Sequence, residues 1–223
     1  MPHAVVVGGN RGIALEMVRQ LCARTEPVWQ VSVVCRSGND ELAPLGARVY
    51  AGVDVTRDEG VTAASDALAG APIDLLVLAA GVLERNALTP LDVASVRRQF
   101  EVNALAPLRM VSTLLEQLAP GSKVALLTSR MGSIADNDSG SHYGYRMSKA
   151  ALNAAGKSLA IDLAPRGIAV GVLHPGYVRT RMTGNTGLID ADESARLLLQ
   201  RIDELDAGTS GSFRHANGDE LPW

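Results

Sequence analysis

Short apolar runs alternate with longer stretches of helical spacing along most of the chain. The runs of strand length are Ala4–Val7, Val31–Cys35, Val49–Val53, Leu75–Ala79, Val124–Thr128, Ala169–Leu173 and, more weakly, Ser212–Arg214. The stretches of helical spacing are Gly12–Ala23, Glu59–Leu68, Val93–Leu118, Tyr143–Ala164 and Ala191–Leu205. Strands that alternate with helices pair in parallel through right-handed crossovers. The pattern therefore predicts a doubly wound α/β fold whose parallel sheet has about seven strands.

Composition and charge exclude several classes of protein. Aromatic residues make up 4% of the chain, too few for the stacking platform that binds single-stranded nucleic acid. The net charge of −3 gives no field that attracts a polyanion, so we expect no nucleic-acid partner. No apolar run approaches about 18 residues and the chain moves straight into a strand, which predicts no membrane association. Cys22 and Cys35 lack zinc-site spacing, so we expect no metal and interpret them as free thiols of a cytoplasmic protein.

A glycine-rich turn follows the first predicted strand and leads directly into the first predicted helix. Glycines let the backbone turn sharply and approach a ligand, while the free amides at the helix start favour a phosphate. A tight turn that binds nothing is the alternative. The binding interpretation places a dinucleotide against Gly8, Asn10, Arg11, Gly12 and Ile13.

The residues after the second strand indicate which dinucleotide fits. An acidic residue there would hold the ribose 2′-hydroxyl of NAD(H), whereas a cation accommodates the 2′-phosphate of NADP(H). Arg36 stands near this place and Arg11 can converge on it, with no competing carboxylate, so we expect NADP(H) rather than NAD(H). The alternative for Arg36 is a solvated loop arginine. Asp54, after the third strand, either accepts from the adenine amino group or caps the helix ahead of Arg57.

A tyrosine and a lysine lie one helical turn apart near the start of a long predicted helix. Tyr145 and Lys149 share a helix face, so the ammonium can lower the phenol pKa from about 10. Tyr143 has no such partner, because Met147 occupies the equivalent position. Ser129 follows the fifth strand, where its hydroxyl can bind a carbonyl oxygen while Tyr145 delivers a proton. The alternatives are a surface contact for the pair and a serine that bonds loop backbone.

Taken in order, these motifs resemble the short-chain dehydrogenase/reductase superfamily over nearly the whole chain. The resemblance rests on the Gly8–Ala14 turn, Asp54-Val55, Ala79-Ala80-Gly81, Asn103, Ser129, Tyr145 with Lys149, and Pro175–Thr180. The stretch Ser129–Ile134 and the ending Phe213–Trp223 are similar to its small carbonyl-reductase and C-factor-like branch. Because the motifs run from Val7 to Thr180 without a boundary, we expect one Rossmann-type domain over residues 1–223.

The resemblance implies hydride transfer between a nicotinamide and a small carbonyl or alcohol substrate. It makes Tyr145 the general acid and base, and Ser129 the group that positions the substrate oxygen. Lys149 would hold the nicotinamide ribose and lower the Tyr145 pKa, while Asn103 would complete a proton relay through water. Further cofactor contacts are implied for Asp54, Val55, Ala80, Gly81, Pro175, Gly176, Val178 and Thr180.

Four positions around the phosphate turn depart from the family pattern. Val7, Ala14, Leu78 and Ala79 stand where the family has a threonine, a glycine and two asparagines. Losing the threonine and the asparagines removes hydrogen bonds between the turn and the fourth strand. We therefore expect a weaker cofactor affinity or a locally looser site.

The connection after Thr180 is short. Arg181–Asp190 leaves little chain for a substrate lid, which predicts an open pocket of loose selectivity. Met131, Ile134 and Met182 are each either a pocket wall or ordinary core.

Assembly and function each leave an alternative open. Small residues on the Tyr145 helix permit close helix packing, either within the subunit or in a homodimer or homotetramer. A dinucleotide-binding regulatory or signalling protein with vestigial chemistry is the second function considered, because fold does not fix function. An epimerase or dehydratase also uses a Tyr–Lys pair but usually needs a larger substrate domain. The intact catalytic residues favour an NADP(H)-dependent oxidoreductase.

Overall fold

A seven-stranded parallel sheet forms the centre of the computed structural model, which describes residues 1–223. The spatial order of the strands is β3-β2-β1-β4-β5-β6-β7. Their bounds are β1 His3–Val7, β2 Gln30–Val34, β3 Arg48–Tyr50, β4 Ile73–Leu78, β5 Leu118–Leu127, β6 Ala169–His174 and β7 Phe213–His215. The predicted doubly wound α/β fold is confirmed, including the weakly signalled last strand.

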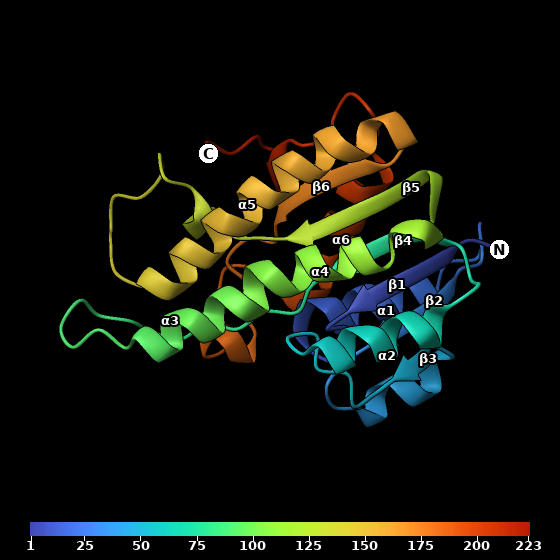
Figure 1. Ribbon diagram of the computed structural model, residues 1–223, viewed down its shortest axis with the longest axis horizontal. Coiled ribbons are helices and arrows are strands. Elements are labelled where there is room, and N and C mark those ends of the chain that lie inside the picture. Colours follow the sequence, from blue (N-terminus) through green and yellow to red (C-terminus); the bar gives the residue numbers. More distant parts are fainter.

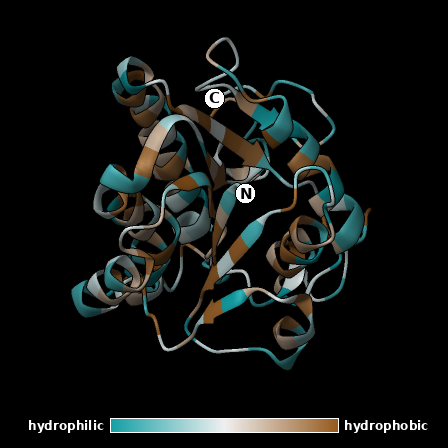
Figure 2. Ribbon diagram, turned by 90° about the vertical axis from the view of Figure 1, so that its right-hand side faces the viewer, coloured by the Kyte–Doolittle hydropathy of each residue, from teal (hydrophilic) through white to brown (hydrophobic).

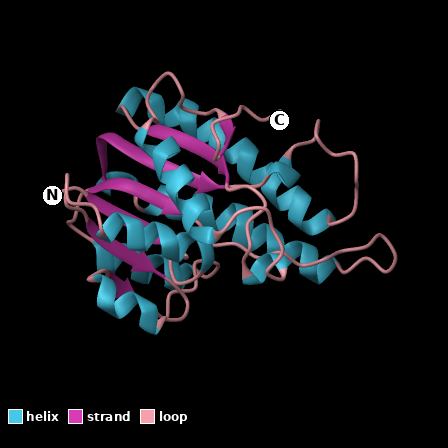
Figure 3. Ribbon diagram, turned by 180° about the vertical axis from the view of Figure 1, so that it is seen from behind, coloured by secondary structure: helices cyan, strands magenta, loops and turns pink.

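Helices cover both faces of this sheet (Figures 1 and 3). One face carries α1 (Gly12–Cys22) and α6 (Ala191–Asp203), which pack against each other. The other carries α2 (Asp58–Leu68), α4 (Ala106–Thr113) and α5 (Tyr143–Leu163), and α3 (Val93–Phe100) extends this layer past the sheet edge. Short 3-10 helices occupy Asp40–Leu45, Leu115–Gln117, Arg130–Gly132, Ala164–Arg166 and Arg181–Thr183. None of the helices has both the length and the apolar character that a bilayer crossing requires.

Alternate residues of each central strand face opposite helical layers, as a strand's period of two requires. In β1, Val5 and Val7 pack with α2, α4 and α5, whereas Ala4 and Val6 pack with α1 and α6. All four are buried, so the strand is apolar throughout. Figure 2 shows the largely hydrophobic strands between two layers of helices.

The long helix predicted over Val93–Leu118 is interrupted in the structure. Between α3 and α4 the residues Glu101–Leu105 form a π-helical turn, and the Ala106 amide bonds to the Glu101 carbonyl five residues back. Pro107 follows at once and has no N–H for the Asn103 carbonyl, so the regular ladder cannot continue through this point. A π turn of this kind is often found at functional sites, and here it carries Asn103.

Strand β5 begins earlier than predicted, at Leu118 instead of Val124. Leu118 pairs with Ile73, but regular pairing resumes only at Lys123 opposite Leu75, because the register shifts between them. The shift follows from Pro120-Gly121, since proline lacks a ladder donor and Gly121 has a φ of 92°.

Two long connections project beyond the carboxyl ends of the strands (Figure 1). One joins β4 to α3 and the other joins β5 to α5. The strand order reverses between β1 and β4, the place where open α/β sheets bind ligands. The candidate site residues therefore gather at this one edge.

Candidate active site

The glycine-rich turn after β1 is shaped by a close approach to the chain that follows β4. Gly8 has a φ of +86°, and a Cβ placed on it would lie 2.7 Å from the Cα of Ala80. Gly12 has a φ of +56°, and a Cβ there would lie 3.7 Å from the methyl carbon of Thr180. The turn, the end of β4 and the segment after β6 therefore meet, as predicted for one binding site.

The amides at the start of α1 are not capped by a side chain. The N-cap residue, Arg11, makes no side-chain bond to the first turn, and no acidic residue occupies that turn. Such a helix start favours an anion through its free amides and its dipole. The geometry fits the pyrophosphate of a dinucleotide.

The phosphate turn is tied to the loop after β2. Asn10 Nδ2 donates to the Ser37 carbonyl at 2.8 Å, and Asn39 Nδ2 donates to the Asn10 carbonyl at 2.9 Å. Asn10 therefore positions the loop, while Arg11 and Arg36 are exposed and make no ion pair. Two unpaired guanidinium groups next to a phosphate-binding turn fit a 2′-phosphate.

Asp54 is engaged locally but does not cap the following helix, because the N-cap position of α2 is Arg57 and no side chain bonds to its first turn. Its Oδ1 accepts hydrogen bonds from the Thr56 amide at 3.0 Å and from the Thr56 hydroxyl at 2.7 Å. These bonds are the main reason that the pKa of Asp54 lies below its usual value, and the Arg36 charge adds to the effect. The structure therefore uses Asp54 to hold the turn after β3, beside the buried Val55.

The departures from the family pattern do not produce a loose site. Val7 and Leu78 lie opposite each other on β1 and β4, and each is only 2% exposed. They pack with Val55 and Ala80 and leave no space for a water molecule. Ala14 is buried as well, and the Ala79 amide bonds to the Val7 carbonyl at 3.0 Å. Packing replaces the missing side-chain hydrogen bonds, so the turn is not locally looser, and the weaker cofactor affinity stays a prediction.

Ser129 and Tyr145 come together at the carboxyl end of β5. Ser129 caps the following 3-10 turn by accepting from the Met131 amide at 3.2 Å, and its hydroxyl lies near the Tyr145 phenol. Both residues are buried, with exposed fractions of 8% and 7%. Burial raises the pKa of Tyr145, and the nearby Ser129 hydroxyl partly offsets that rise. The phenol is thus held in its protonated form.

Lys149 lies under Tyr145, with its Nζ 5.9 Å from the centre of the phenol ring. The ammonium donates to the Leu127 carbonyl at 2.8 Å, and burial lowers its pKa to about 8. We expected Lys149 to lower the Tyr145 pKa, but the desolvation of the phenol dominates and the net shift is upward. Sequence spacing could give the proximity of the two groups but not the depth at which they are buried.

Asn103 connects the chain after β4 to α5. Its Oδ1 accepts from the Val82 amide at 2.8 Å, and its Nδ2 donates to the Val82 carbonyl and to Ser148 Oγ, both at 2.9 Å. A Cβ on Gly81 would lie 3.4 Å from Asn103 Oδ1 and 3.9 Å from Lys149 Nζ, so these groups share one site. The structure therefore gives Asn103 an anchoring role.

The segment after β6 folds into a compact turn. Ser194 donates to the Pro175 carbonyl at 2.8 Å, next to Gly176, and Val178 is buried and pairs with Ile189. Thr180 caps the 3-10 turn Arg181–Thr183. Ile134 and Met182 are exposed and Met131 is half-buried, so none of these three is ordinary core.

The motifs in the sequence did not identify two residues near the site, Ser148 and Gly132. Ser148 is fully buried. Its Oγ accepts from Asn103 Nδ2 and donates to the Tyr145 carbonyl at 2.8 Å, so it links Asn103 to the start of α5. Its spacing of three from Tyr145 was an available signal, because such residues share a helix face. Gly132 approaches α5 so closely that a Cβ would lie 2.7 Å from the Lys149 carbonyl carbon, and nothing in the sequence indicates this contact.

No group of His, Cys, Asp and Glu residues could hold a metal ion.

Comparisons with known proteins agree with this geometry. Residues 2–188 match the short chain dehydrogenase family. The chain is 40% identical to 1-hydroxy-2-glutathionyl-2-methyl-3-butene dehydrogenase of Rhodococcus sp. (strain AD45), over 229 positions and the whole of both proteins. It is 46% identical to the C-signal of Myxococcus xanthus over 155 positions, 68% of this chain and 93% of that protein.

Solved structures of similar proteins share the fold. The carbonyl reductase Sniffer of D. melanogaster superposes with a TM-score of 0.91 at 27% identity, covering 100% of both chains. The NADPH-bound carbonyl reductase from chicken fatty liver also gives 0.91 at 27% identity, covering 100% of this chain and 99% of the other.

Proposed function

The chain belongs to the short-chain dehydrogenase family of oxidoreductases, and from that premise we propose that it is an NADP(H)-dependent reductase of small carbonyl compounds. The observation that carries the proposal is that Ser129, Tyr145 and Lys149 are buried together at the carboxyl ends of the strands, with the Lys149 Nζ 5.9 Å from the centre of the phenol ring, on the same sheet edge as the phosphate turn. The NADPH-bound state of a structural neighbour supports the cofactor.

Each of the four catalytic candidates has a separate role in the proposed reaction. NADPH, when bound, supplies a hydride to the substrate carbon. Ser129 Oγ donates a hydrogen bond to the carbonyl oxygen and fixes its place beside the phenol. Tyr145 Oη then gives its proton to that oxygen, so that the carbonyl becomes an alcohol. Lys149 would hold the ribose and return a proton to Tyr145, and Asn103 would complete this proton path through water.

The cofactor is held by the turn and the strand ends. Gly8, Gly12 and Ile13 would place backbone amides against the pyrophosphate, and Val55, Ala80 and Gly81 would border the adenosine. The segment from Pro175 through Gly176 and Val178 to Thr180 would border the nicotinamide. Arg11 and Arg36 would bind the 2′-phosphate, which is the contact that separates NADP(H) from NAD(H).

Replacing Arg36 with aspartate is expected to reverse the cofactor preference. The carboxylate repels the 2′-phosphate and can accept from the free 2′-hydroxyl, so NADPH should bind about 10- to 100-fold more weakly while NADH gains affinity. Fluorescence titration with each cofactor measures both changes. Arg97→Asp, on the exposed side of α3, makes the same change of charge and should leave both affinities unaltered. Unaltered NADPH affinity in Arg36→Asp would contradict the assignment.

The substrate is tested by following NADPH consumption with aldehydes, ketones and quinones, and NADP⁺ reduction with alcohols. The alcohols should include one that carries a glutathionyl group, because a relative identical at 40% of positions is named for such a substrate. Turnover of one of these classes, with NADPH preferred to NADH, is the expected result.

A second candidate function is signalling through dinucleotide binding with little or no chemistry. The 46% identity to the C-signal of Myxococcus xanthus favours it. Tight NADPH binding without turnover of any substrate in the panel would support this second function and contradict the first.

We extend the proposal to a homodimer or homotetramer built on α5. Met147, Ala154 and Ile161 are seven residues apart and so lie on one outward face, where Met147 is 54% and Ile161 is 62% exposed. Gly156 packs inside the subunit instead, because a Cβ there would lie 2.5 Å from Val172 Cγ2. Light scattering should give two or four times the chain mass of 23.4 kDa.

The free thiols Cys22 and Cys35 suit a reducing compartment such as the cytoplasm.

A further inference from the structure

The helix that carries Tyr145 begins without a cap of its own. The residue at its N-cap position, His142, makes no side-chain bond to the first turn of α5 and has a φ of 52°. Ser141, just before it, has a φ of 58°. Two successive non-glycine residues in the left-handed region are costly, and such a conformation persists only where the surroundings hold it.

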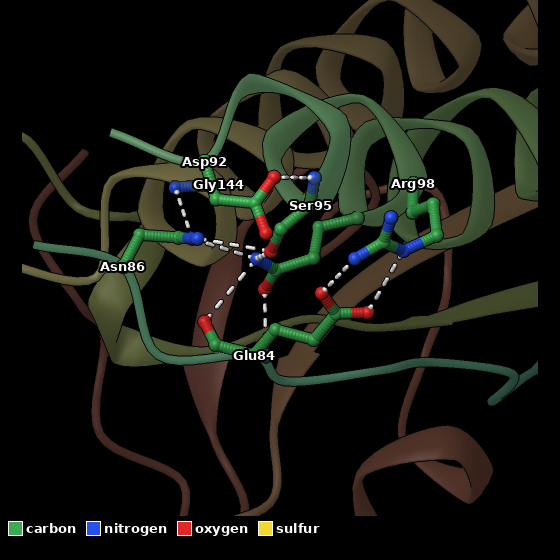
Figure 4. Close-up of polar contacts among 7 residues, drawn as sticks. Glu84, Asn86, Asp92, Ser95, Arg98 and Gly144 are labelled. Atoms are coloured by element: carbon green, nitrogen blue, oxygen red, sulfur yellow. Dashed lines mark hydrogen bonds and ion pairs between the residues drawn. The ribbon is translucent and has the colours of Figure 1, made fainter. Parts of the chain in front are cut away.

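A side chain from a distant part of the chain supplies the missing cap. Asn86 lies in the connection between β4 and α3, and its Oδ1 accepts from the Gly144 amide at 3.2 Å (Figure 4). Gly144 is the second residue of α5, and an N-cap side chain normally accepts from the second or third amide. The Asn86 carbonyl also accepts from the His142 amide at 3.1 Å. Asn86 therefore binds the amide of His142, in the left-handed segment, and the amide of Gly144, in the first turn of α5.

The Asn86 carboxamide is itself fixed by buried partners on α3. Its Nδ2 donates to Ser95 Oγ at 2.9 Å, and its Oδ1 accepts from Gln99 Nε2 at 2.8 Å. Gln99 Oε1 accepts from the Glu84 amide at 3.0 Å, which closes the network back onto the same connection. Asn86, Ser95 and Gln99 are at most 4% exposed, so the hydrogen bonds are shielded from water.

Gly144 allows this contact because it has no side chain. A Cβ at that position would lie 2.7 Å from Asn86 Oδ1, 2.5 Å from Gln99 Nε2 and 3.0 Å from the Cα of Val96. The start of α5 thus rests directly on α3, and Tyr145 is the next residue in the chain.

We propose that Asn86 is a positioning residue for Tyr145: by capping α5 from the connection after β4, it holds the phenol against Ser129. The inference rests on the proposed reductase function. Without the cap, the first turn of α5 opens more often and the phenol leaves its place beside Ser129. A displacement of about 1 Å in a reacting group can lower a rate about 100-fold.

The test compares Asn86→Ala, Asn86→Asp and the control Asp206→Ala. Asp206 caps another turn, accepting from the Thr209 amide at 2.9 Å, at the start of the loop before β7 and away from the carboxyl ends of the strands. Asn86→Ala should lower kcat about 10- to 100-fold with an unchanged KM for NADPH. Asn86→Asp should retain most of kcat, because a carboxylate still accepts from Gly144, Gln99 and the Ser95 hydroxyl. Asp206→Ala should keep kcat at the wild-type value.

A second measurement does not depend on turnover. Amide hydrogen exchange of Gly144 and Tyr145 should accelerate about five-fold or more in Asn86→Ala, and stay near wild type in the other two variants. Gly144→Ala, which pushes the helix start away from an intact Asn86, should reproduce the loss of kcat if Asn86→Ala does not fold.

The outcomes separate this inference from the proposed function. Wild-type protein that turns over no substrate contradicts the reductase, and the exchange rates alone then decide whether Asn86 caps α5. Unchanged exchange in Asn86→Ala overturns the inference, as does a wild-type kcat in that variant. So does an Asn86→Asp variant no more active than Asn86→Ala, or an equal loss in Asp206→Ala.

Discussion

Tyr145→Phe is expected to lower kcat about 100- to 10,000-fold, the range that a general acid contributes, while NADPH binds with unchanged affinity. The substitution removes only the phenolic oxygen, so the ring keeps its packing at a position that is 7% exposed. What is lost is the phenolic proton donor that the proposed reaction requires beside Ser129.

The chain offers a matched control two residues away. Tyr143→Phe makes the same chemical change on the same helix, but the residue one turn later is Met147, with no ammonium. It should retain wild-type kcat. Steady-state rates of NADPH oxidation and a fluorescence titration measure turnover and binding separately. Turnover by Tyr145→Phe at the wild-type rate would exclude this phenol as the acid.

Lys149→Met should remove most of the activity and yet make the cofactor-free fold more stable. The ordinary pKa of 10.5 falls to about 8 because the ammonium is buried. Between these values the unfolded chain binds a proton that the folded chain does not, so the free energy of unfolding rises with pH across that window. Below about pH 8 the full cost applies, roughly 3 kcal/mol at about 1.4 kcal/mol per pKa unit.

Thermal unfolding at several pH values measures this effect. At pH 7 Lys149→Met should melt higher, by at most about 6–12 °C, less whatever is lost with the bond to the Leu127 carbonyl. The difference should shrink as pH rises from 8 toward 10.5. Lys157→Met, at an exposed position of the same helix, should show no such pH dependence. A melting difference for Lys149→Met that is constant with pH would mean that the buried charge is not its cause.

The sequence was sufficient for the fold because the strands are apolar on both faces and the helices between them are amphipathic. It also predicted that the candidate residues lie close together, because the carboxyl ends of parallel strands bring Gly8, Ala80, Ser129 and Pro175 to one edge of the sheet. The break at Glu101–Leu105 was predictable in principle, because Pro107 stands in the middle of an otherwise helical pattern.

Other features depend on contacts that no local pattern encodes. The direction of the Tyr145 pKa shift depends on how deeply the phenol is buried, which is a property of the assembled fold. Asn86 looks like an ordinary loop residue, because the Gly144 amide that it caps lies 58 positions further along the chain. The looser turn expected from Val7 and Leu78 does not form, because both departures are apolar and lie opposite each other.

That last pairing limits how the turn can change during evolution. Threonine at position 7 alone would place a hydroxyl in a cluster that leaves no room for water, and asparagine at position 78 alone would do the same with an amide. Each single change would therefore bury a polar group without a water partner, which costs about 1–3 kcal/mol. A return to the family's polar side chains at this turn thus has to change the packing around it as well.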